Sequence, residues 1–428
     1  MKFLFIAYYF PPIQSSGIFR NWNITRFLRP KVDSIDVVTT SNRHRLPQEA
    51  RNTVLEDSFG KGVKIHEAAT LDYRTLTTFR PRKNIHFNEE AKANPLVKLG
   101  IRLLDSFPLN LIIGEGGLIY IISGFWKARQ IIQNQGVTHI YSSFRPMSDH
   151  AVAYLLKRRY PSVFWIADYR DLHVDPLYKN VIFEKFQHAC NRLILRRANL
   201  VTTISSGLKV HLDRYHPSVY VFRNGVFLSK IDKKRLPFPK FTVAYTGSMF
   251  GDERNPTLFL EVIKILKEEH ILTADNFQIL YAGKDTGVWH TWLNRFGLKD
   301  VFHSKGLVST DEAIDIQKNA HINLLLTSAL PGYGGILTGK FYEYVAAQQP
   351  ILVLINGAQD LEFESIIDDL NIGLVAYNDM SFDSVKDFIL TKFKEWQQTG
   401  DVKPTVLKEK LAELSWEFRI DDFIEKIS

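Results

Sequence analysis

The chain has 428 residues, which exceeds what one typical hydrophobic core organises and suits two domains. Hydrophobic residues make up 45% and charged residues 23%, a balance that excludes intrinsic disorder as the state of the whole chain. The formal net charge of +8 bears on binding partners rather than on the fold.

Two apolar stretches could be mistaken for membrane segments. Residues 1–7 form a short apolar run, but two prolines follow at once and no small-residue cleavage site is present, so we expect a buried strand rather than a signal peptide. Residues 107–126 contain Asn110 and Glu115, which make a spanning helix too costly. The single cysteine, Cys190, excludes internal disulfides and indicates a reducing compartment. We therefore expect a cytoplasmic protein.

Basic residues gather in the first 240 positions, at 80–83, 157–159, 192–197 and 230–235. Each cluster by itself is typical of a solvated helix face or loop. Their joint bias to one half leaves a second interpretation open, which is contact with anionic lipid headgroups or with a phosphorylated acceptor. No nucleic-acid-binding motif accompanies the charge, so we do not expect a nucleic acid as partner.

Short apolar runs alternate with longer amphipathic stretches, which is typical of βα units on a parallel sheet. In the first half the expected strands are residues 3–7, 35–39, 139–142, 164–167, 200–204 and 219–222. The expected helices are residues 19–28, 148–159, 183–197 and 206–215. Residues 46–98 suit an irregular insertion with one strand near 63–66, and an Asn-Gly turn at 224–225 ends this half.

A stretch rich in lysine and proline follows at 229–240 and is expected to link two domains. The second half has expected strands at 242–245, 277–282, 301–303, 322–326, 351–355 and 373–376, and expected helices at 256–269, 288–296, 310–318, 339–347, 362–369, 382–397 and 406–427. We predict a Rossmann-like domain over 1–228, to which the C-terminal helix at 410–428 returns, and a second one over 241–409. Two such α/β domains are expected to face each other across a cleft, since open sheets bind ligands beyond the carboxyl ends of their strands.

The segment with the clearest chemistry is glycine-rich and joins the strand 322–326 to the helix from residue 339. Glycines let a backbone approach an anion closely, and the free amides of a helix N-terminus favour phosphate. Lys340 and Glu343 share one face of the first helical turn. A lysine beside a diphosphate and a carboxylate that accepts hydrogen bonds from ribose hydroxyls suit a nucleotide sugar. The alternative is an ordinary helix with a surface ion pair.

This segment resembles the donor-site motif of the bacterial retaining glycosyltransferases with the GT-B fold, the family-four group that includes mannosyltransferases and capsule or O-antigen transferases. Further segments match the group in order, at residues 8–20, 167–171, 201–205, 223–226, 245–248 and 415–417. The resemblance covers nearly the whole chain apart from 46–98. It implies transfer of a sugar, with retention, from a nucleotide-diphosphate sugar to a glycan or lipid-linked acceptor. The basic first half and the apolar stretch 107–126 favour an acceptor at the inner face of a membrane.

In the second half the resemblance implies that Glu343 binds the ribose. Arg254 and Lys340 would take the phosphate charge, because Ser248 stands where the group has an arginine. Gly335 replaces the first glutamate of the group's paired-glutamate motif, so backbone amides would replace its contact to the donor sugar. The base would lie near positions 283–284 and 305–308. The implied donor-binding residues are Ser248, Gly283, Leu307, Gly335, Ile336, Leu337, Thr338, Gly339 and Glu343.

In the first half the resemblance implies that Gly17 belongs to a loop approaching the phosphates and the acceptor. Arg20 would point into the cleft or brace it. Arg170 and Asp171 occupy the place where many relatives have a histidine that touches the donor sugar, so we expect either a substrate contact or a structural ion pair. His150 is a candidate on the acceptor side, with a structural histidine as the alternative.

The chain contains no Asp-x-Asp sequence and no Cys/His cluster, so we expect neither a metal site nor a cofactor. Transfer would then depend on the helix N-terminus and on the predicted catalytic residues Arg170, Asp171, Arg254 and Lys340. Two alternatives stay open. One is a catalytically silent relative that binds a nucleotide sugar or supports a partner enzyme, because Gly335 and Ser248 each remove a group that such catalysis uses. The other is a sugar-nucleotide epimerase of the same architecture.

Overall fold

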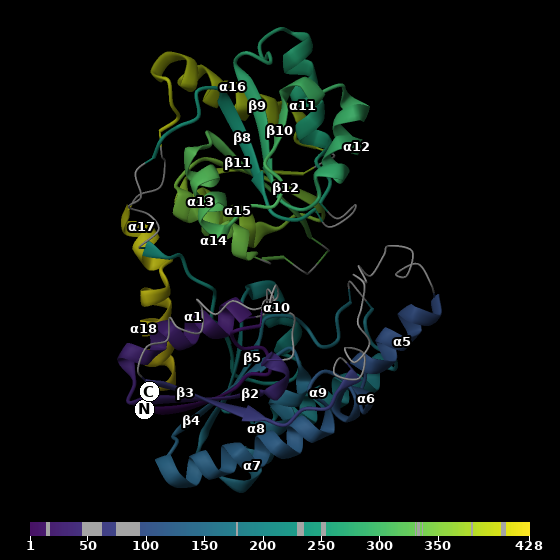
Figure 1. The fold of residues 1–428 in the computed structure, drawn as a ribbon, viewed down its shortest axis with the longest axis vertical. Coiled ribbons are helices and arrows are strands. Elements are labelled where there is room, and N and C mark those ends of the chain that lie inside the picture. Colours follow the sequence, from purple (N-terminus) through teal and green to yellow (C-terminus); the bar gives the residue numbers. More distant parts are fainter. Residues whose placement is uncertain are drawn as a thin grey trace. The chain divides into compact units, whose positions relative to one another are not determined.

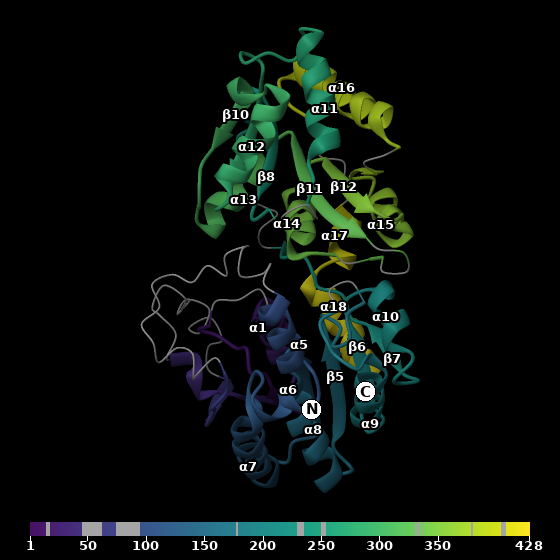
Figure 2. The ribbon, with the colours of Figure 1, turned by 90° about the vertical axis from the view of Figure 1, so that its right-hand side faces the viewer.

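The structure is a computed structural model that describes residues 1–13, 18–44, 62–73, 95–176, 179–228, 235–249, 254–329, 331, 334–335, 337–377, 380–403 and 408–428. The chain divides into a first unit, Met1–Arg223 with Lys426–Ser428, and a second unit, Asn224–Glu425. Each unit is a Rossmann-like α/β domain built on its own parallel sheet, with helices on both faces (Figures 1 and 2).

The first unit has a seven-stranded sheet in the order β3-β2-β1-β4-β5-β6-β7. Its strands are β1 (Lys2–Ile6), β2 (Ser34–Thr40), β3 (Val63–Ala68), β4 (His139–Phe144), β5 (Phe164–Tyr169), β6 (Leu200–Thr203) and β7 (Val219–Val221). Its described α-helices are α1 (Ile18–Leu28), α5 (Pro95–Asp105), α6 (Leu109–Ile112), α7 (Gly117–Gln135), α8 (Met147–Arg159), α9 (Glu184–Leu195) and α10 (Ser206–Leu212). The strand order reverses between β1 and β4, so the loops after these two strands lie at the edge where such sheets bind ligands.

The second unit has a six-stranded sheet in the order β10-β9-β8-β11-β12-β13. Its strands are β8 (Phe241–Thr246), β9 (Phe277–Ala282), β10 (Phe302–Ser304), β11 (Ile322–Ala329), β12 (Ile351–Gly357) and β13 (Gly373–Tyr377). Its described α-helices are α11 (Thr257–Glu268), α12 (Thr286–Phe296), α13 (Thr310–Asn319), α14 (Gly339–Ala347), α15 (Leu361–Leu370), α16 (Phe382–Thr399), α17 (Lys408–Glu413) and all but the last two residues of α18 (Trp416–Ile427). Here the order reverses between β8 and β11.

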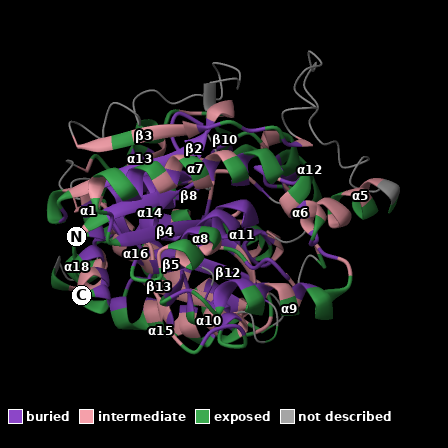
Figure 3. Cartoon of the chain, turned by 90° about the horizontal axis from the view of Figure 1, so that it is seen from below, coloured by how far each residue is buried: buried purple, intermediate pink, exposed green. Residues whose placement is uncertain are grey.

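The strands are apolar along most of their length because helices cover both faces of each sheet. Every residue of β8 is buried, and Figure 3 shows the buried residues concentrated in the central strands. In the second unit one cluster packs β8 and β9 against α11, α12 and α16, and another packs β12 against α14 and α15. The two clusters cover opposite sides of the sheet, and the second one packs α14 against Leu325 and Ala329 of β11.

The predicted βα series is confirmed in both sheets, and α14 begins and ends at the predicted residues. The strand expected near 63–66 is β3, and the other described parts of 46–98 include the start of α5. The stretch 107–126 forms α6 and the first half of α7. Among the described residues, no helix has the length and apolar character needed to cross a bilayer.

The prediction of one closing helix over 406–427 is wrong. The structure has α17 and α18 instead, with a break at residues 414–415. The hydroxyl of Ser415 accepts a hydrogen bond from the backbone N–H of Phe418 at 3.1 Å, and Ser415 also forms a β-bridge with Val226. A serine that caps the next helix and forms a bridge with a residue distant in the sequence ends the preceding helix.

Part of the expected linker, 229–234, lies outside the described residues. Arg235 follows it and is bound to the second unit. Its guanidinium donates to the carbonyls of Lys318 at 2.8 Å and Ala320 at 3.0 Å, and it forms an ion pair with Asp401. The chain is therefore anchored to the second unit before β8 begins.

Candidate functional site

The candidate donor site lies at the carboxyl ends of β8 and β11, which are neighbours where the strand order reverses. Helix α14 follows β11 and begins at Gly339. Its N-cap, Thr338, makes no side-chain capping hydrogen bond, and the hydroxyl oxygen of Thr338 is buried without a partner among the described residues. The first turn of a helix carries N–H groups that lack partners within the helix, and such a turn suits an anion.

Lys340 extends from this first turn toward the loop after β8. Its Nζ donates to the hydroxyl of Tyr245 at 3.1 Å and to the carbonyl of Ser248 at 3.4 Å, and it lies 4.4 Å from the centre of the Tyr245 ring. Gly247 makes room for this path, because a Cβ atom at position 247 would lie 2.7 Å from Nζ. The fold thus connects α14 to the loop after β8 through one lysine.

Arg254 reaches the same carbonyl oxygen. Its Nη1 donates to the carbonyl of Ser248 at 2.8 Å, and the hydroxyl of Tyr245 donates to it at 2.9 Å. Lys340 and Arg254, to which the resemblance assigns the phosphate charge, are therefore brought together around Ser248. Ser248 contributes its backbone oxygen to this arrangement.

The surroundings of Lys340 lower the pKa of its ammonium group. Burial lowers the pKa of Lys340 to about 7, and the charge of Arg254 adds to this lowering, whereas Glu343 and Asp285 oppose it. Burial also raises the pKa of Tyr245 to about 12. A phosphate group beside Lys340 would favour its charged form.

Glu343 is exposed on α14 and turns toward α13. Its Oε2 accepts a hydrogen bond from Nε2 of Gln317 at 3.1 Å. Gln317 is buried and also donates to Oγ1 of Thr246 at 2.8 Å. Lys340 and Glu343 therefore have different partners and do not form the surface ion pair that was the alternative. No pattern in the sequence points to Gln317, because it lies 26 residues before Glu343.

Gly335 has φ +79°, and its N–H donates to Oδ2 of Asp360 at 2.7 Å. Asp360 also accepts from the N–H of Phe363 at 3.0 Å, and burial raises the pKa of the Asp360 carboxyl. A Cβ atom at position 335 would overlap the carboxylate of Glu362, which lies in the first turn of α15. A side chain at position 335 would require the carboxylate end of Glu362 to move, and the φ of +79° would strain any residue other than glycine.

The residues assigned to the base follow β9 and β10. The N–H of Gly283 donates to the carbonyl of Gly306 at 2.8 Å, and a Cβ at position 283 would lie 2.7 Å from Cζ of Tyr281. Leu307 is 84% exposed, so it presents an apolar surface at this edge. Leu337, in contrast, packs in the core beside α14 and offers a ligand only its backbone.

In the first unit, Arg20 braces a strand. It is buried, and its guanidinium makes two hydrogen bonds to the carboxylate of Asp168, at 2.7 and 2.8 Å. Asp168 is fully buried at the end of β5 and also accepts from Oγ1 of Thr202 at 2.7 Å. The Arg20 guanidinium lies over the ring of Phe222, 5.0 Å from its centre. Arg20 thus ties α1 to β5 and β6.

Arg170 and Asp171 follow β5 and form an ion pair with each other, with 3.5 Å between Nε and Oδ2. Asp171 remains 60% exposed at this edge of the sheet. His150 is fully buried on α8, shares a hydrogen bond with the hydroxyl of Ser142 at 2.8 Å, and has its pKa lowered to about 3 by burial. This burial favours the structural interpretation of His150. Gly17 and Ile336 lie outside the described residues.

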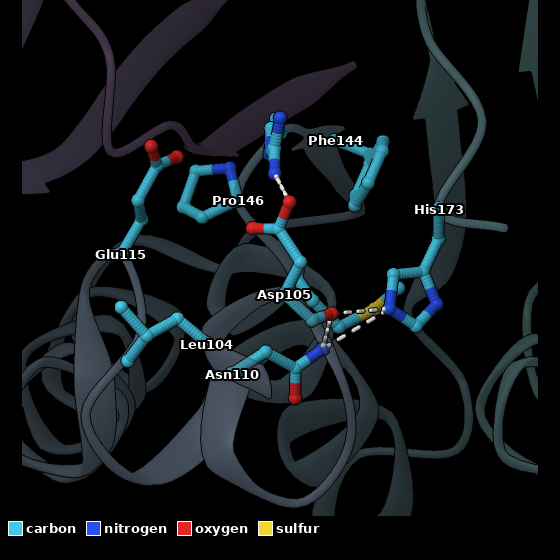
Figure 4. Close-up of a pocket in the computed structure, with 9 residues that line it drawn as sticks. Leu104, Asp105, Asn110, Glu115, Phe144, Pro146 and His173 are labelled. Carbon is cyan, nitrogen blue, oxygen red and sulfur yellow. Dashed lines mark hydrogen bonds and ion pairs between the residues drawn. The ribbon is translucent and has the colours of Figure 1, made fainter. Parts of the chain in front are cut away.

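A polar pocket that the sequence did not predict opens beside β4 (Figure 4). It encloses about 280 Å³, counting the solvent at its mouth, and its lining includes Asp105, Asn110, Glu115 and His173. Arg145 forms an ion pair with Asp105 there. Burial opposes the charge of Arg145, but Asp105 and Glu115 outweigh it and raise the pKa of the guanidinium.

His173 is a buried histidine in the lining of this pocket. Its Nε2 lies 3.0 Å from the carbonyl oxygen of Asp105 and 3.2 Å from Nδ2 of Asn110, as Figure 4 shows. Burial lowers the pKa of His173 to about 4. Arg145 directly follows β4, and His173 lies in the loop after β5. Polar residues after the carboxyl ends of parallel strands are candidates for a ligand site, and this position in the sequence could have identified both. Within the described ranges, no group of three or more His, Cys, Asp or Glu side chains could hold a metal ion.

No protein-family model and no curated protein matches the chain. Solved structures do. Sucrose-phosphate synthase from Thermosynechococcus elongatus has a TM-score of 0.59 at 12% identity, over 100% of this chain and 98% of that chain. An apo structure of OtsA has a TM-score of 0.59 at 10% identity, over 100% and 99%.

A mutant of S. aureus TarM, solved in complex with fondaparinux, alpha-GlcNAc-glycerol and UDP, has a TM-score of 0.54 at 9% identity, over 100% of this chain and 97% of that chain. Identities this low establish similarity of fold alone. The two Rossmann-like units of this chain therefore have the GT-B fold.

Proposed function

We propose that the chain is a glycosyltransferase that uses a nucleotide-diphosphate sugar as donor. The observation that supports this most is the convergence of Lys340 and Arg254 on the carbonyl of Ser248, beside the first turn of α14. A departing diphosphate needs positive charge and N–H donors that are already in place. The fold adds support, because proteins of this architecture include glycosyltransferases.

The proposed reaction proceeds with retention, without a metal and without a cofactor. The N–H groups at the start of α14, Lys340 and Arg254 hold the diphosphate, and Glu343 accepts hydrogen bonds from the ribose hydroxyls. The acceptor hydroxyl attacks the anomeric carbon from the face that the diphosphate leaves, and its proton passes to a phosphate oxygen. One C–O bond forms and one breaks, so the chain's own residues need only orient the donor and neutralise charge.

We further propose that the acceptor is a glycan or lipid-linked sugar at the inner face of a membrane. The apolar strip, defined as Ile112, Ile113, Leu118, Ile119, Ile122 and Trp126, is 42–54% exposed on α6, the residue after it and α7. The α7 members fall on one side of that helix because they lie one, four and eight positions after Leu118. Helix α7 contains Lys127 and Arg129 and no acidic residue, and the Arg129 guanidinium lies 4.9 Å from the centre of a Trp126 ring. Exposed apolar side chains beside cations suit an anionic lipid surface.

Calorimetric titration of the purified full chain with UDP, GDP, ADP and TDP tests the donor site. We expect one of these diphosphates to bind, and Lys340→Ala or Glu343→Ala to weaken it while the fold is retained. If none binds, the donor site has been assigned wrongly.

Incubation with the corresponding radiolabelled nucleotide sugars and a membrane lipid extract tests the reaction. Label transferred to lipid supports the glycosyltransferase. Epimerised free donor supports the sugar-nucleotide epimerase, and binding without turnover supports a catalytically silent relative.

A further inference from the structure

The polar pocket beside β4 is built from two separate parts of the first unit. Phe144, Arg145 and Pro146 come from the end of β4 and the residues after it, whereas Asp105 and Asn110 come from α5 and α6. Strand β4 pairs with β1, and the strand order reverses between them, so the pocket lies at the edge of the sheet where ligands bind. Pockets for drug-sized ligands enclose about 300–1,000 Å³. The volume of about 280 Å³ found here therefore suits one sugar-sized group.

Buried polar groups hold Asp105 in place through its backbone. The carbonyl oxygen of Asp105 lies 3.0 Å from Nε2 of His173 and accepts a hydrogen bond from Nδ2 of Asn110 at 3.3 Å. Nδ1 of His173 lies 3.0 Å from Nδ2 of Asn191, which suits a neutral imidazole with its proton on Nε2. Figure 4 shows the Asp105 carbonyl turned toward Asn110 and His173 and the carboxylate turned away from them.

The carboxylate of Asp105 forms an ion pair with Arg145. The Arg145 side chain is 39% exposed and that of Asp105 is 21% exposed, so a ligand in the pocket can reach both. A guanidinium carries five N–H donors and a carboxylate about four acceptor positions, more than one ion pair uses. A sugar hydroxyl both donates and accepts, so two adjacent hydroxyls match a guanidinium and a carboxylate that lie side by side.

The charge of the pocket distinguishes an uncharged ligand from an anion. One guanidinium and the two carboxylates of Asp105 and Glu115 line it, together with the neutral imidazole of His173. A phosphate in the pocket would compete with Asp105 for Arg145 and would be repelled by both carboxylates. An uncharged group with hydroxyls avoids both costs.

The pocket is continuous along the chain with the apolar strip. Asn110 and Glu115 line the pocket, and Ile112 and Ile113 of the strip lie between them in the sequence. A lipid-linked acceptor whose apolar part contacts the strip would therefore bring its sugar close to the pocket.

We propose that this pocket binds an uncharged sugar unit of the acceptor, and that Arg145 and Asp105 bind two adjacent hydroxyls of that unit. The inference rests on the proposed function, since it needs a glycan or a lipid-linked sugar as acceptor. It also places any phosphate of the acceptor outside this pocket.

NMR titration of the full chain with the methyl glycosides of glucose, galactose, mannose and N-acetylglucosamine tests the pocket. We expect at least one glycoside to bind and excess inorganic phosphate to leave its affinity unchanged. Arg145→Gln and Asp105→Asn should each weaken glycoside binding about tenfold, the range of a hydrogen bond to a charged group. In Asp105→Asn phosphate should begin to compete with the glycoside, because the pocket has lost a negative charge and Arg145 has lost its partner.

Asp213→Asn is the matched control, because Asp213 also forms an exposed ion pair in the first unit, with Lys209. It should change neither the glycoside affinity nor the effect of phosphate. Calorimetric titration with the nucleoside diphosphates should give the same affinity in all these variants, since the donor site is in the second unit.

Three results would each overturn the inference and leave the donor site intact. They are no binding of any of the four glycosides, glycoside affinities that are the same in the wild type, Arg145→Gln and Asp105→Asn, and displacement of the glycoside from the wild type by phosphate. The phosphate competition needs no variant, so it decides the matter even where a substitution lowers the thermal unfolding midpoint. Failure of the unaltered chain to bind any diphosphate would instead contradict the proposed function itself.

Discussion

Gly247 and Lys340 come from different elements and fit against each other. A Cβ atom at position 247 would lie 2.7 Å from the lysine Nζ, and Gly247 has φ +105°, a backbone conformation that alanine adopts only with strain. The glycine after β8 therefore determines whether the lysine of α14 can reach Tyr245 and Ser248.

Gly247→Ala is expected to displace the Lys340 ammonium and weaken diphosphate binding about tenfold, which calorimetric titration would measure. Gly297→Ala is the matched control. Gly297 has φ +69° at the end of α12, but no atom lies within 4 Å of its added Cβ. Both variants should lose about 1 kcal/mol of stability through backbone strain, and only the first should lose affinity. Equal diphosphate affinities in the two variants would show that Gly247 is needed only for its backbone conformation and not for the placement of Lys340.

Lys340→Met should weaken diphosphate binding by about tenfold to a hundredfold, because a charge-assisted hydrogen bond to phosphate contributes about 1.5–3 kcal/mol. The apolar stem of methionine fills the same path past Gly247, so the thermal unfolding midpoint should not fall. Lys264→Met removes an exposed lysine of α11 that pairs with Glu268, and it serves as the control. Wild-type affinity in Lys340→Met would remove the donor-site assignment.

The depressed pKa of Lys340 predicts that diphosphate binding takes up a proton. With its pKa near 7 in the empty site, Lys340 is largely neutral at pH 8, whereas a bound diphosphate favours its charged form. Affinity should therefore fall as the pH rises from 7 to about 9. Titrations in buffers of different ionisation enthalpy would measure the proton uptake, and Lys340→Met should abolish it.

The same shift predicts the sign of a stability change. The folded-state pKa lies below the ordinary lysine value, so the unfolded chain binds more protons between pH 7 and about 10. The contribution of Lys340 to the free energy of unfolding therefore rises with pH across that window. Denaturant titrations at several pH values would give the free energy of unfolding of the wild type and of Lys340→Met, and the difference between the two is the contribution of Lys340. A difference that falls or stays flat with pH would contradict the prediction.

Local patterns predicted much of this fold because both sheets are parallel and buried. Strands such as β8 are buried along their whole length and therefore stand out as short, mostly apolar segments. Helix α14 begins at Gly339, at the end of a glycine-rich segment that indicates where the helix starts. The contacts of the site are different in kind. Gln317 meets Glu343, and Glu362 meets Gly335, across separations that no local spacing reveals. The helix break at Ser415 has the same origin. Ser415 pairs with Val226, which lies near the start of the second unit in the sequence, so no pattern close to Ser415 predicts the break.

Arg20 is expected to matter for stability more than for donor binding. Arg20→Met would leave the carboxylate of Asp168 fully buried without its ion-pair partner, which costs about 3–5 kcal/mol. The double variant Arg20→Met with Asp168→Leu removes both charges and should recover part of that loss. Chemical denaturation would measure all three free energies. A stable Arg20→Met protein with lost diphosphate binding would instead assign Arg20 to the ligand.

The apolar strip provides the prediction that links the fold to the acceptor. Replacing Ile122 and Trp126 together with glutamate puts two negative charges where apolar side chains are 51% and 54% exposed. Co-sedimentation with vesicles of phosphatidylglycerol and phosphatidylcholine should show binding by the wild type and about tenfold less by this variant.

Val210→Glu, at a 65% exposed position on α10, is the control for adding charge at an exposed apolar site elsewhere in the first unit. Vesicles of phosphatidylcholine alone should bind the wild type weakly, because Lys127 and Arg129 need anionic headgroups. Diphosphate affinity should be the same in all three proteins, so unchanged vesicle binding by the double variant would reject the strip as the membrane contact without touching the donor site.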